Sequence, residues 1–157
     1  MVATFLALGP LAALNVQIWQ IFIAWACFYN SGDKTEGAQK TANCMIFGAL
    51  DGMLSVLLIG QLGALGALAA PVAVRIAAAV IVRTAHIGML ATIPASVYGV
   101  ASIAGLILLK GLSPVEAIGP TVASIMLGAA FGWVSEQIAD KLTKVTASSG
   151  SSAVPVF

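Results

Sequence analysis

The sequence carries very little charge. Only 8% of its 157 residues are Asp, Glu, Lys or Arg, whereas an ordinary soluble domain has roughly 25%. Apolar residues make up 60% of the chain, and the mean hydropathy is +1.03. So few polar side chains could not cover a surface that faces water. The composition therefore excludes a soluble globular protein and predicts that lipid surrounds most of the chain.

Other absences exclude classes of function. The net charge is +1, so the chain has no basic field that could hold nucleic acid. It has one histidine, two cysteines and none of the HExxH, CxxC, GxSxG or phosphate-loop patterns of common catalytic sites. We therefore expect no enzyme activity, no cofactor and no metal. Cys27 and Cys44 lie in or beside apolar runs, which is typical of buried structural thiols.

Five predominantly apolar stretches approach the roughly 20 residues that a helix needs to cross a bilayer. They predict an all-α fold, a polytopic membrane helix bundle with about five transmembrane helices. We expect a single transmembrane domain over residues 1–144 and a flexible tail over residues 145–157, where Ser and Ala replace long apolar runs. The predicted spans are Val2–Tyr29, Thr41–Leu62, Pro71–Ala91, Ile93–Leu109 and Pro114–Gln137.

The first predicted span is the most polar. Pro10, Asn15, Gln17 and Gln20 interrupt its apolar run, and lipid tolerates such groups only where protein or water meets them. The span is therefore expected to be kinked or discontinuous. A discontinuous helix that lines a cavity and a proline kink with its amides facing neighbouring helices both fit this pattern.

The basic residues predict the orientation, because Lys and Arg on short loops tend to stay cytoplasmic. With five spans, five of them fall on the side of the C-terminus and two on the other, so we expect a cytoplasmic C-terminus. The five are Lys34, Lys40, Arg83, Lys141 and Lys144, and the two are Arg75 and Lys110.

Glycines four residues apart occur in two spans, as Gly48 with Gly52 and Gly128 with Gly132. This spacing puts both glycines on one helix face, where two backbones can approach closely. The two pairs lie 80 residues apart, and an offset of 80 also aligns other identical residues. If this reflects an internal repeat, spans one and two match spans four and five in inverted orientation. The further matches are Glu36 with Glu116, Thr41 with Thr121, Ala49 with Ala129, and Ser55 with Ser135.

Ionisable side chains inside spans are costly, so they mark candidate sites. Asp51 and Arg83 are predicted at similar depths from the cytoplasmic face, with His86 on the same helix face as Arg83. An Asp51–Arg83 ion pair would satisfy both charges. Such a pair either locks two helices together or lines an aqueous path, and Arg83 could instead reach the membrane surface. With Asn15 and Gln20, these residues form the candidate intramembrane polar site.

Two stretches resemble a known family. They are IWQIFIAWACFYNSG with the following IFGALDG, and IPASVYG with GPTVASIMLGAAFGWVSE. From about Trp19 to Leu142 the chain resembles small bacterial inner-membrane proteins catalogued as domain of unknown function 1097. The resemblance implies a bacterial inner membrane and no catalytic residues, because that family has no established activity. The part ahead of Trp19 is shorter than expected of relatives with another leading helix, so the number of crossings is five or six.

Two functions fit these features. The first is a channel or transporter for a small solute or ion, acting as a homo-oligomer because five short helices leave little room for both a pore and its walls. The second is a structural or assembly subunit that docks on a larger membrane complex through its glycine faces. A lipid-modifying membrane enzyme is a lesser third, since it would need a second acid or base near His86.

Overall fold

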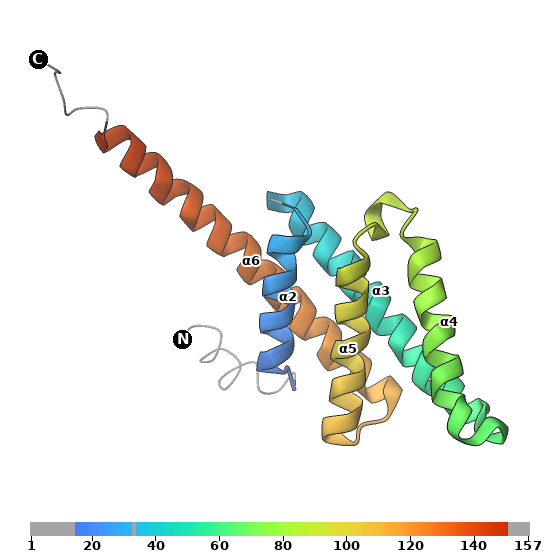
Figure 1. Ribbon diagram of the computed structural model, residues 1–157. Helices are drawn as coiled ribbons and strands as arrows, with labels where there is room; N and C mark the ends of the chain where they lie inside the picture. The colour runs from blue at the N-terminus through green and yellow to red at the C-terminus, as the bar shows by residue number, and fades with distance from the viewer. Residues whose placement is uncertain (1–14, 33, 151–157) are drawn as a thin grey trace, which may run out of the picture.

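The computed structural model describes residues 15–32 and 34–150, with side chains described as far as residue 143. This part of the chain folds into five α-helices joined by short connections, two of which contain 3-10 turns (Figure 1). The helices are α2 (Ile18–Asn30), α3 (Lys34–Gln61), α4 (Ala69–Thr84), α5 (Ile93–Lys110) and α6 (Pro114–Gly150), and the turns are η2 (Gly63–Leu68) and η3 (Gly88–Leu90).

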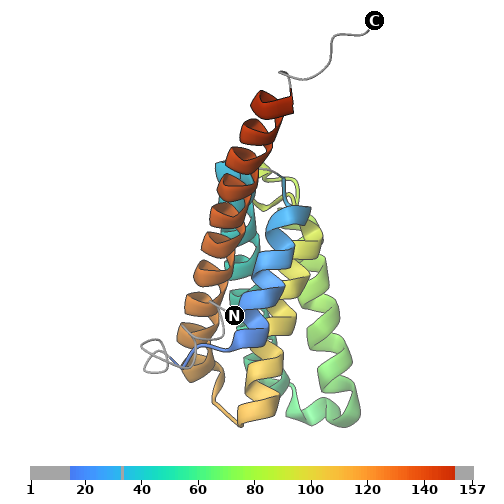
Figure 2. The ribbon, with the colours of Figure 1, turned by 90° about the vertical axis from the view of Figure 1, so that its left-hand side faces the viewer.

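Four helical segments are long and apolar enough to cross a membrane. They are Lys34–Gln61, Gly63–Thr84, Ile93–Lys110 and Pro114–Thr143. The fifth helix, α2, has 13 residues, about 20 Å of helix, and lies within the bundle beside α6 (Figure 2). The predicted polytopic helical bundle is therefore confirmed, with four clear spans in the described residues.

Within the described residues, the first predicted span, Val2–Tyr29, is helical only from Ile18. Residues 15–17 are not helical, Asn15 has a φ of 51°, and α2 begins only at Ile18. Pro10 lies outside the described residues. The predicted kink or discontinuity therefore lies largely outside the described residues and stays a prediction.

Three predicted boundaries are wrong. The charged segment before Thr41 is not a loop but the first turns of α3, where Lys40 and Glu36 form an ion pair of 2.7 Å across one helical turn. The third span was expected to reach Ala91, but α4 ends at Thr84 and a turn with η3 follows. Finally, α6 continues to Gly150 and projects beyond the bundle, so the segment expected to be a tail from Val145 begins as helix (Figure 1).

The bundle contains an inverted repeat. In Figure 1, α2 and α6 run upward while α3 and α5 run downward. The α2–α3 pair therefore has the opposite direction to the α5–α6 pair, and the two pairs interlock, with α2 packed on α6 and α3 packed on α5. The remaining helix, α4, packs mainly on α3.

The buried residues repeat in register. Every buried position of α2 has a buried counterpart in α5, 75 residues later. These pairs are Gln20 and Ala95, Ile21 and Ser96, Ala24 and Gly99, Cys27 and Ser102, and Phe28 and Ile103. Seven buried positions of α3 recur 80 residues later in α6. They are Gly37, Thr41, Cys44, Met45, Gly48, Ala49 and Gly52, matched by Ala117, Thr121, Ser124, Ile125, Gly128, Ala129 and Gly132.

The paired glycines make equivalent helix crossings. Gly48 lies against the backbone carbonyl of Ser96, and Gly128 lies against that of Ile21. A Cβ atom on Gly52 would come 2.8 Å from Ile103 Cγ2. On Gly132 it would come 2.5 Å from Phe28 Cγ. All four glycines therefore sit where helices touch inside one chain, at the packing positions that their spacing predicted.

Candidate functional site

The five residues of the predicted polar site do not come together. Only Gln20, which is fully buried, and Asp51, which is 8% exposed, face the interior. Asn15, Arg83 and His86 are exposed. The predicted site is therefore wrong as a single cluster, because its members divide between the bundle interior and its surface.

The Asp51–Arg83 ion pair is not formed among the described residues. In the part of the chain that has described side chains, Asp51 Oδ2 is buried and accepts no hydrogen bond. Arg83 is exposed, and the buried face of α4 is the stripe of Ala69, Ala73, Ala77 and Ile81. The carboxylate and the guanidinium therefore lie apart.

The predicted ion pair is not formed because the boundaries of α3 and α4 differ from those predicted. Because α3 begins at Lys34, Asp51 lies 17 residues, about 25 Å, from that end. Because α4 ends at Thr84, Arg83 lies in its last turn. Both corrections separate the two charges along the helices, since Asp51 lies farther from the start of α3 than predicted and Arg83 lies nearer to the end of α4.

Gln20 forms the centre of a buried polar cluster between the two helix pairs. Its Nε2 donates to the carbonyl oxygen of Ser102 at 2.8 Å and to the hydroxyl of Thr121 at 3.2 Å, so α2 is joined to both α5 and α6. All three residues are fully buried. The cluster contains only amide and hydroxyl groups, so it can bind polar groups without introducing charge.

Several buried polar atoms have no partner among the described residues. Gln20 Oε1, Ser102 Oγ and Thr41 Oγ1 are buried and make no hydrogen bond to any described residue. An unsatisfied polar atom is costly in a bilayer, where no bulk water can reach it. These atoms are therefore the strongest candidates in the described structure for contact with a bound water or solute.

Sequence reasoning missed Ser102 as a site residue. Hydroxyl side chains are common in membrane helices, where they bond across helix contacts, so one serine carries no signal by itself. Thr41 and Thr121 did have a signal, since they are identical residues at the repeat offset of 80. That signal pointed to the repeat and not to a polar cluster.

Two cavities lie away from this polar cluster. One of about 560 Å³ lies between α3, α4 and α5, and Ser55 is the sole lining residue with a polar side chain. Because the Ser55 hydroxyl donates to the carbonyl of Ala73 at 3.2 Å, this cavity offers little to a polar solute. It suits an apolar occupant such as a lipid chain.

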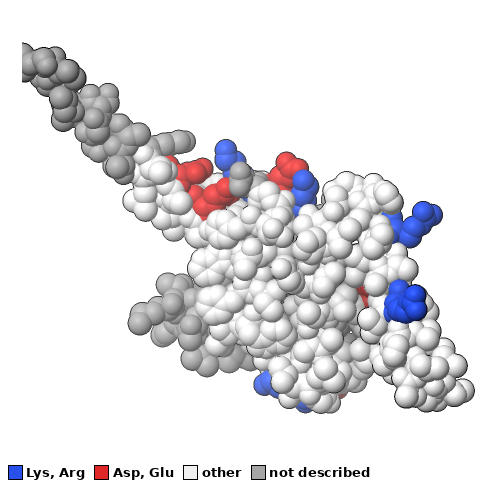
Figure 3. Space-filling view, viewed as in Figure 1, with Lys and Arg blue, Asp and Glu red and all other residues white. Residues whose placement is uncertain are grey.

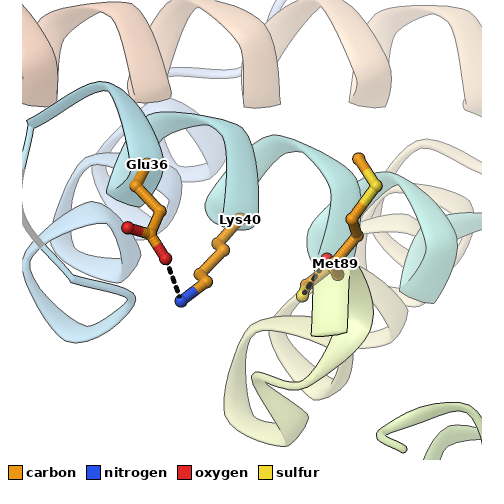
Figure 4. Close-up of polar contacts among 4 residues, drawn as sticks. Glu36, Lys40 and Met89 are labelled. Carbon is orange, nitrogen blue, oxygen red and sulfur yellow. Dashed lines mark hydrogen bonds and ion pairs between the residues drawn. The ribbon is translucent and has the colours of Figure 1, made fainter. Parts of the chain in front are cut away.

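The other cavity, of about 510 Å³, lies at the start of α3 beside η3. Figure 4 shows Glu36 and Lys40 pointing toward each other there, with Met89 of η3 beside a later turn of α3. Charged side chains gather at this end of the visible face in Figure 3, around the start of α3 and the outer part of α6. The middle of that face is largely uncharged, as expected of a surface in lipid.

Comparison with known proteins gives one match. No curated protein and no solved structure matches the chain. The model of the family described as "Protein of unknown function (DUF1097)" matches residues 1–140, which is most of the chain and includes every residue of the polar cluster. The protein therefore belongs to the DUF1097 family, as the resemblance of its tryptophan, glycine and proline patterns predicted.

Proposed function

We propose that the protein is a channel or transporter through which a small solute or ion crosses the membrane between the α2–α3 and α5–α6 pairs. The observation that carries this proposal is the set of unpartnered, fully buried polar atoms at the interface of the inverted repeat. Transporters built from inverted repeats bind their substrates near the middle of the membrane, at the interface between repeats. Small movements of one pair against the other would expose such an interface to each side in turn.

The glycine contacts weigh against the alternative of an assembly subunit. That alternative needs Gly48, Gly52, Gly128 and Gly132 to be free for docking on another protein. Each of them instead contacts a neighbouring helix of the same chain. A partner would have to bind a different surface.

Flux across proteoliposomes tests the proposal. Purified protein is reconstituted with a panel of small neutral solutes and monovalent ions, and uptake is compared with that of empty liposomes. We expect uptake of at least one panel member, and we expect Gln20→Leu to abolish it because the polar group at the interface is lost. The matched control is Gln39→Leu, since Gln39 is an exposed residue of the same type near the start of α3.

The contrary result is equally clear. If no panel member enters, or if Gln20→Leu transports as well as the parent protein does, the interface does not conduct. Recovery of the protein in a stable complex with another membrane protein would then favour the assembly role.

The orientation and oligomeric state remain predictions. A reporter fused after Lys144 should indicate a cytoplasmic C-terminus, and a reporter active only in the periplasm should stay inactive. The proposed route lies within one chain, so the predicted homo-oligomer would be an association of separate routes. Mass measurement in detergent tests that state. We also keep the prediction of a bacterial inner-membrane location without enzyme activity.

A further inference from the structure

We propose that the repeat interface contains two equivalent half-sites, which bind the same small, uncharged solute from opposite sides of the membrane. The α3-side half-site consists of Cys27 and Thr41. The α6-side half-site consists of Ser102 and Thr121, joined by Gln20. This inference rests on the proposed function, because it names where the solute binds and what chemistry it has.

The two half-sites occupy equivalent positions. Cys27 and Ser102 are related by the offset of 75 between α2 and α5, and Thr41 and Thr121 by the offset of 80 between α3 and α6. All four side chains are fully buried. The chemistry is matched as well, with a threonine in both places and a thiol in one where the other has a hydroxyl of similar size.

Their depths are also matched, from opposite faces. Thr41 lies seven residues, about 10 Å, from the start of α3 at Lys34. Thr121 lies seven residues, about 10 Å, from the start of α6 at Pro114. Because α3 and α6 run in opposite directions, each half-site is near a different side of the membrane (Figure 1).

Each half-site has unused hydrogen-bonding capacity. Thr41 Oγ1 is buried and makes no hydrogen bond to a described residue, while the Cys27 sulfur lies 3.6 Å from the Ser31 hydroxyl. At the α6-side half-site, Ser102 Oγ and Gln20 Oε1 are unpartnered. Hydroxyls both donate and accept, and the amide oxygen accepts.

This inventory selects the class of solute. No charged side chain belongs to either half-site, so neither offers compensation for a full charge taken out of water. A small neutral molecule with both donors and acceptors, such as a short polyol or an amide, fits these groups. Because the side chains are fully buried, the structure corresponds to a closed conformation that must open to admit the solute.

Cys27, a native cysteine of the α3-side half-site, provides a test that does not depend on knowing the solute. In Cys44→Ala, Cys27 is the remaining thiol. In the triple variant Cys27→Ser with Cys44→Ala and Ser102→Cys, the thiol moves to the other half-site. Cys27→Ser and Ser102→Cys each introduce the residue found at the equivalent position, so we expect both proteins to fold, and thermal unfolding checks this.

Alkylation by a membrane-impermeant maleimide is measured from each side of oriented vesicles. We expect Cys27 to react about tenfold faster from the side of the α3 start, and Ser102→Cys about tenfold faster from the side of the α6 start. Glycerol and urea are the solute probes, and at least one should slow both reactions. Cys27→Ser, which leaves Cys44 as the sole thiol, is the control. Cys44 is also fully buried and donates to the carbonyl oxygen of Met89 at 3.5 Å. Because it belongs to neither half-site, it should react slowly from both sides.

Two results would overturn the half-sites: equal reaction from both sides, or no reaction at either thiol in the folded protein. Sided reaction that both probes leave unchanged would overturn the solute class. These outcomes are distinct from failure of the proposed function. Flux with unsided labelling would leave transport standing and remove the half-sites, whereas sided labelling without flux would remove transport and leave two sided openings.

Discussion

The two halves of the inverted repeat share a packing pattern but differ in chemistry. Their buried positions correspond along α2 and α5 and along α3 and α6, so the same shape is built twice. Several equivalent positions carry different chemical groups, and three of them bear on the polar groups discussed above. They are Gln20 and Ala95, Cys27 and Ser102, and Asp51 and Phe131. The buried positions that correspond in the two halves explain how the helices pack. The polar side chains that only one half carries are where a specific activity would be located.

The largest effect is expected where the two halves agree. In Gly48→Leu and Gly128→Leu, the new side chain would overlap the backbone carbonyls of Ser96 and Ile21, and neither helix can yield locally. We expect each variant to lose about 3 kcal/mol or more of stability, seen as loss of monodisperse protein in detergent or a lower Tm.

Matched controls come from the same two helices. A Cβ atom on Gly60 of α3 or Gly119 of α6 meets no atom within 4 Å. Gly60→Leu and Gly119→Leu should therefore unfold close to the parent temperature. If the crossing variants were as stable as these controls, the repeated helix contacts would be misplaced.

The next largest loss of stability is expected when Gln20 is replaced by the residue at the equivalent position in the other half. Gln20→Ala copies Ala95 and removes the two hydrogen bonds that join α2 to Ser102 and Thr121. Interhelical hydrogen bonds in membranes contribute about 0.6 kcal/mol on average and up to about 1.7, so we expect a loss of about 1–2 kcal/mol. Thermal unfolding measures it, and Gln39→Ala is the exposed control. Equal stability of the two variants would mean that the cluster contributes nothing to folding.

Smaller losses of stability, which differ between the two halves, are expected at the starts of α3 and α6. At the start of α6, Ser113 Oγ donates to Glu116 Oε2 at 2.7 Å, and the Ser113 backbone N–H donates to the same oxygen at 3.0 Å. At the start of α3 there is instead an exposed ion pair between Lys40 and Glu36. Ser113→Ala should cost about 1 kcal/mol, as loss of a helix cap does, and Lys40→Ala about 0.3–0.5 kcal/mol. Equal losses in urea or thermal unfolding would contradict this ranking.

How much the sequence could predict depends on the kind of signal. The bounds of α5 were predicted to within one residue, because the kink expected around Pro94 lies at its start and the helix breaker Gly111 follows its end. The match of α3 with α6 was visible because both helices keep glycines at their crossings. The match of α2 with α5 was not, since none of their equivalent buried residues is identical. Packing there requires a suitable shape, which different residues can provide.

Depth in the membrane was the quantity that sequence reasoning judged worst. A helix boundary shifted by seven residues moves a side chain by about 10 Å, which is enough to make or remove an ion pair. The charged first turns of α3 were interpreted as a loop, and the segment after Thr84 was interpreted as helix. The first error followed from treating charge as the boundary of a span, and the second from extending the apolar stretch to Ala91. The errors brought Asp51 and Arg83 to the same predicted level.

The smallest expected effect is the coupling between Asp51 and Arg83. Had they formed an ion pair, Asp51→Asn combined with Arg83→Gln would be milder than the sum of the single changes, because each single change leaves the other charge unpaired. The structure separates a buried carboxylate in α3 from an exposed guanidinium at the end of α4. The two changes should therefore add to within about 0.5 kcal/mol in a double-mutant cycle of thermal or denaturant unfolding. Coupling of 1 kcal/mol or more, about twice that limit, would show that the two charges meet in the membrane and would restore the ion pair inferred from the sequence.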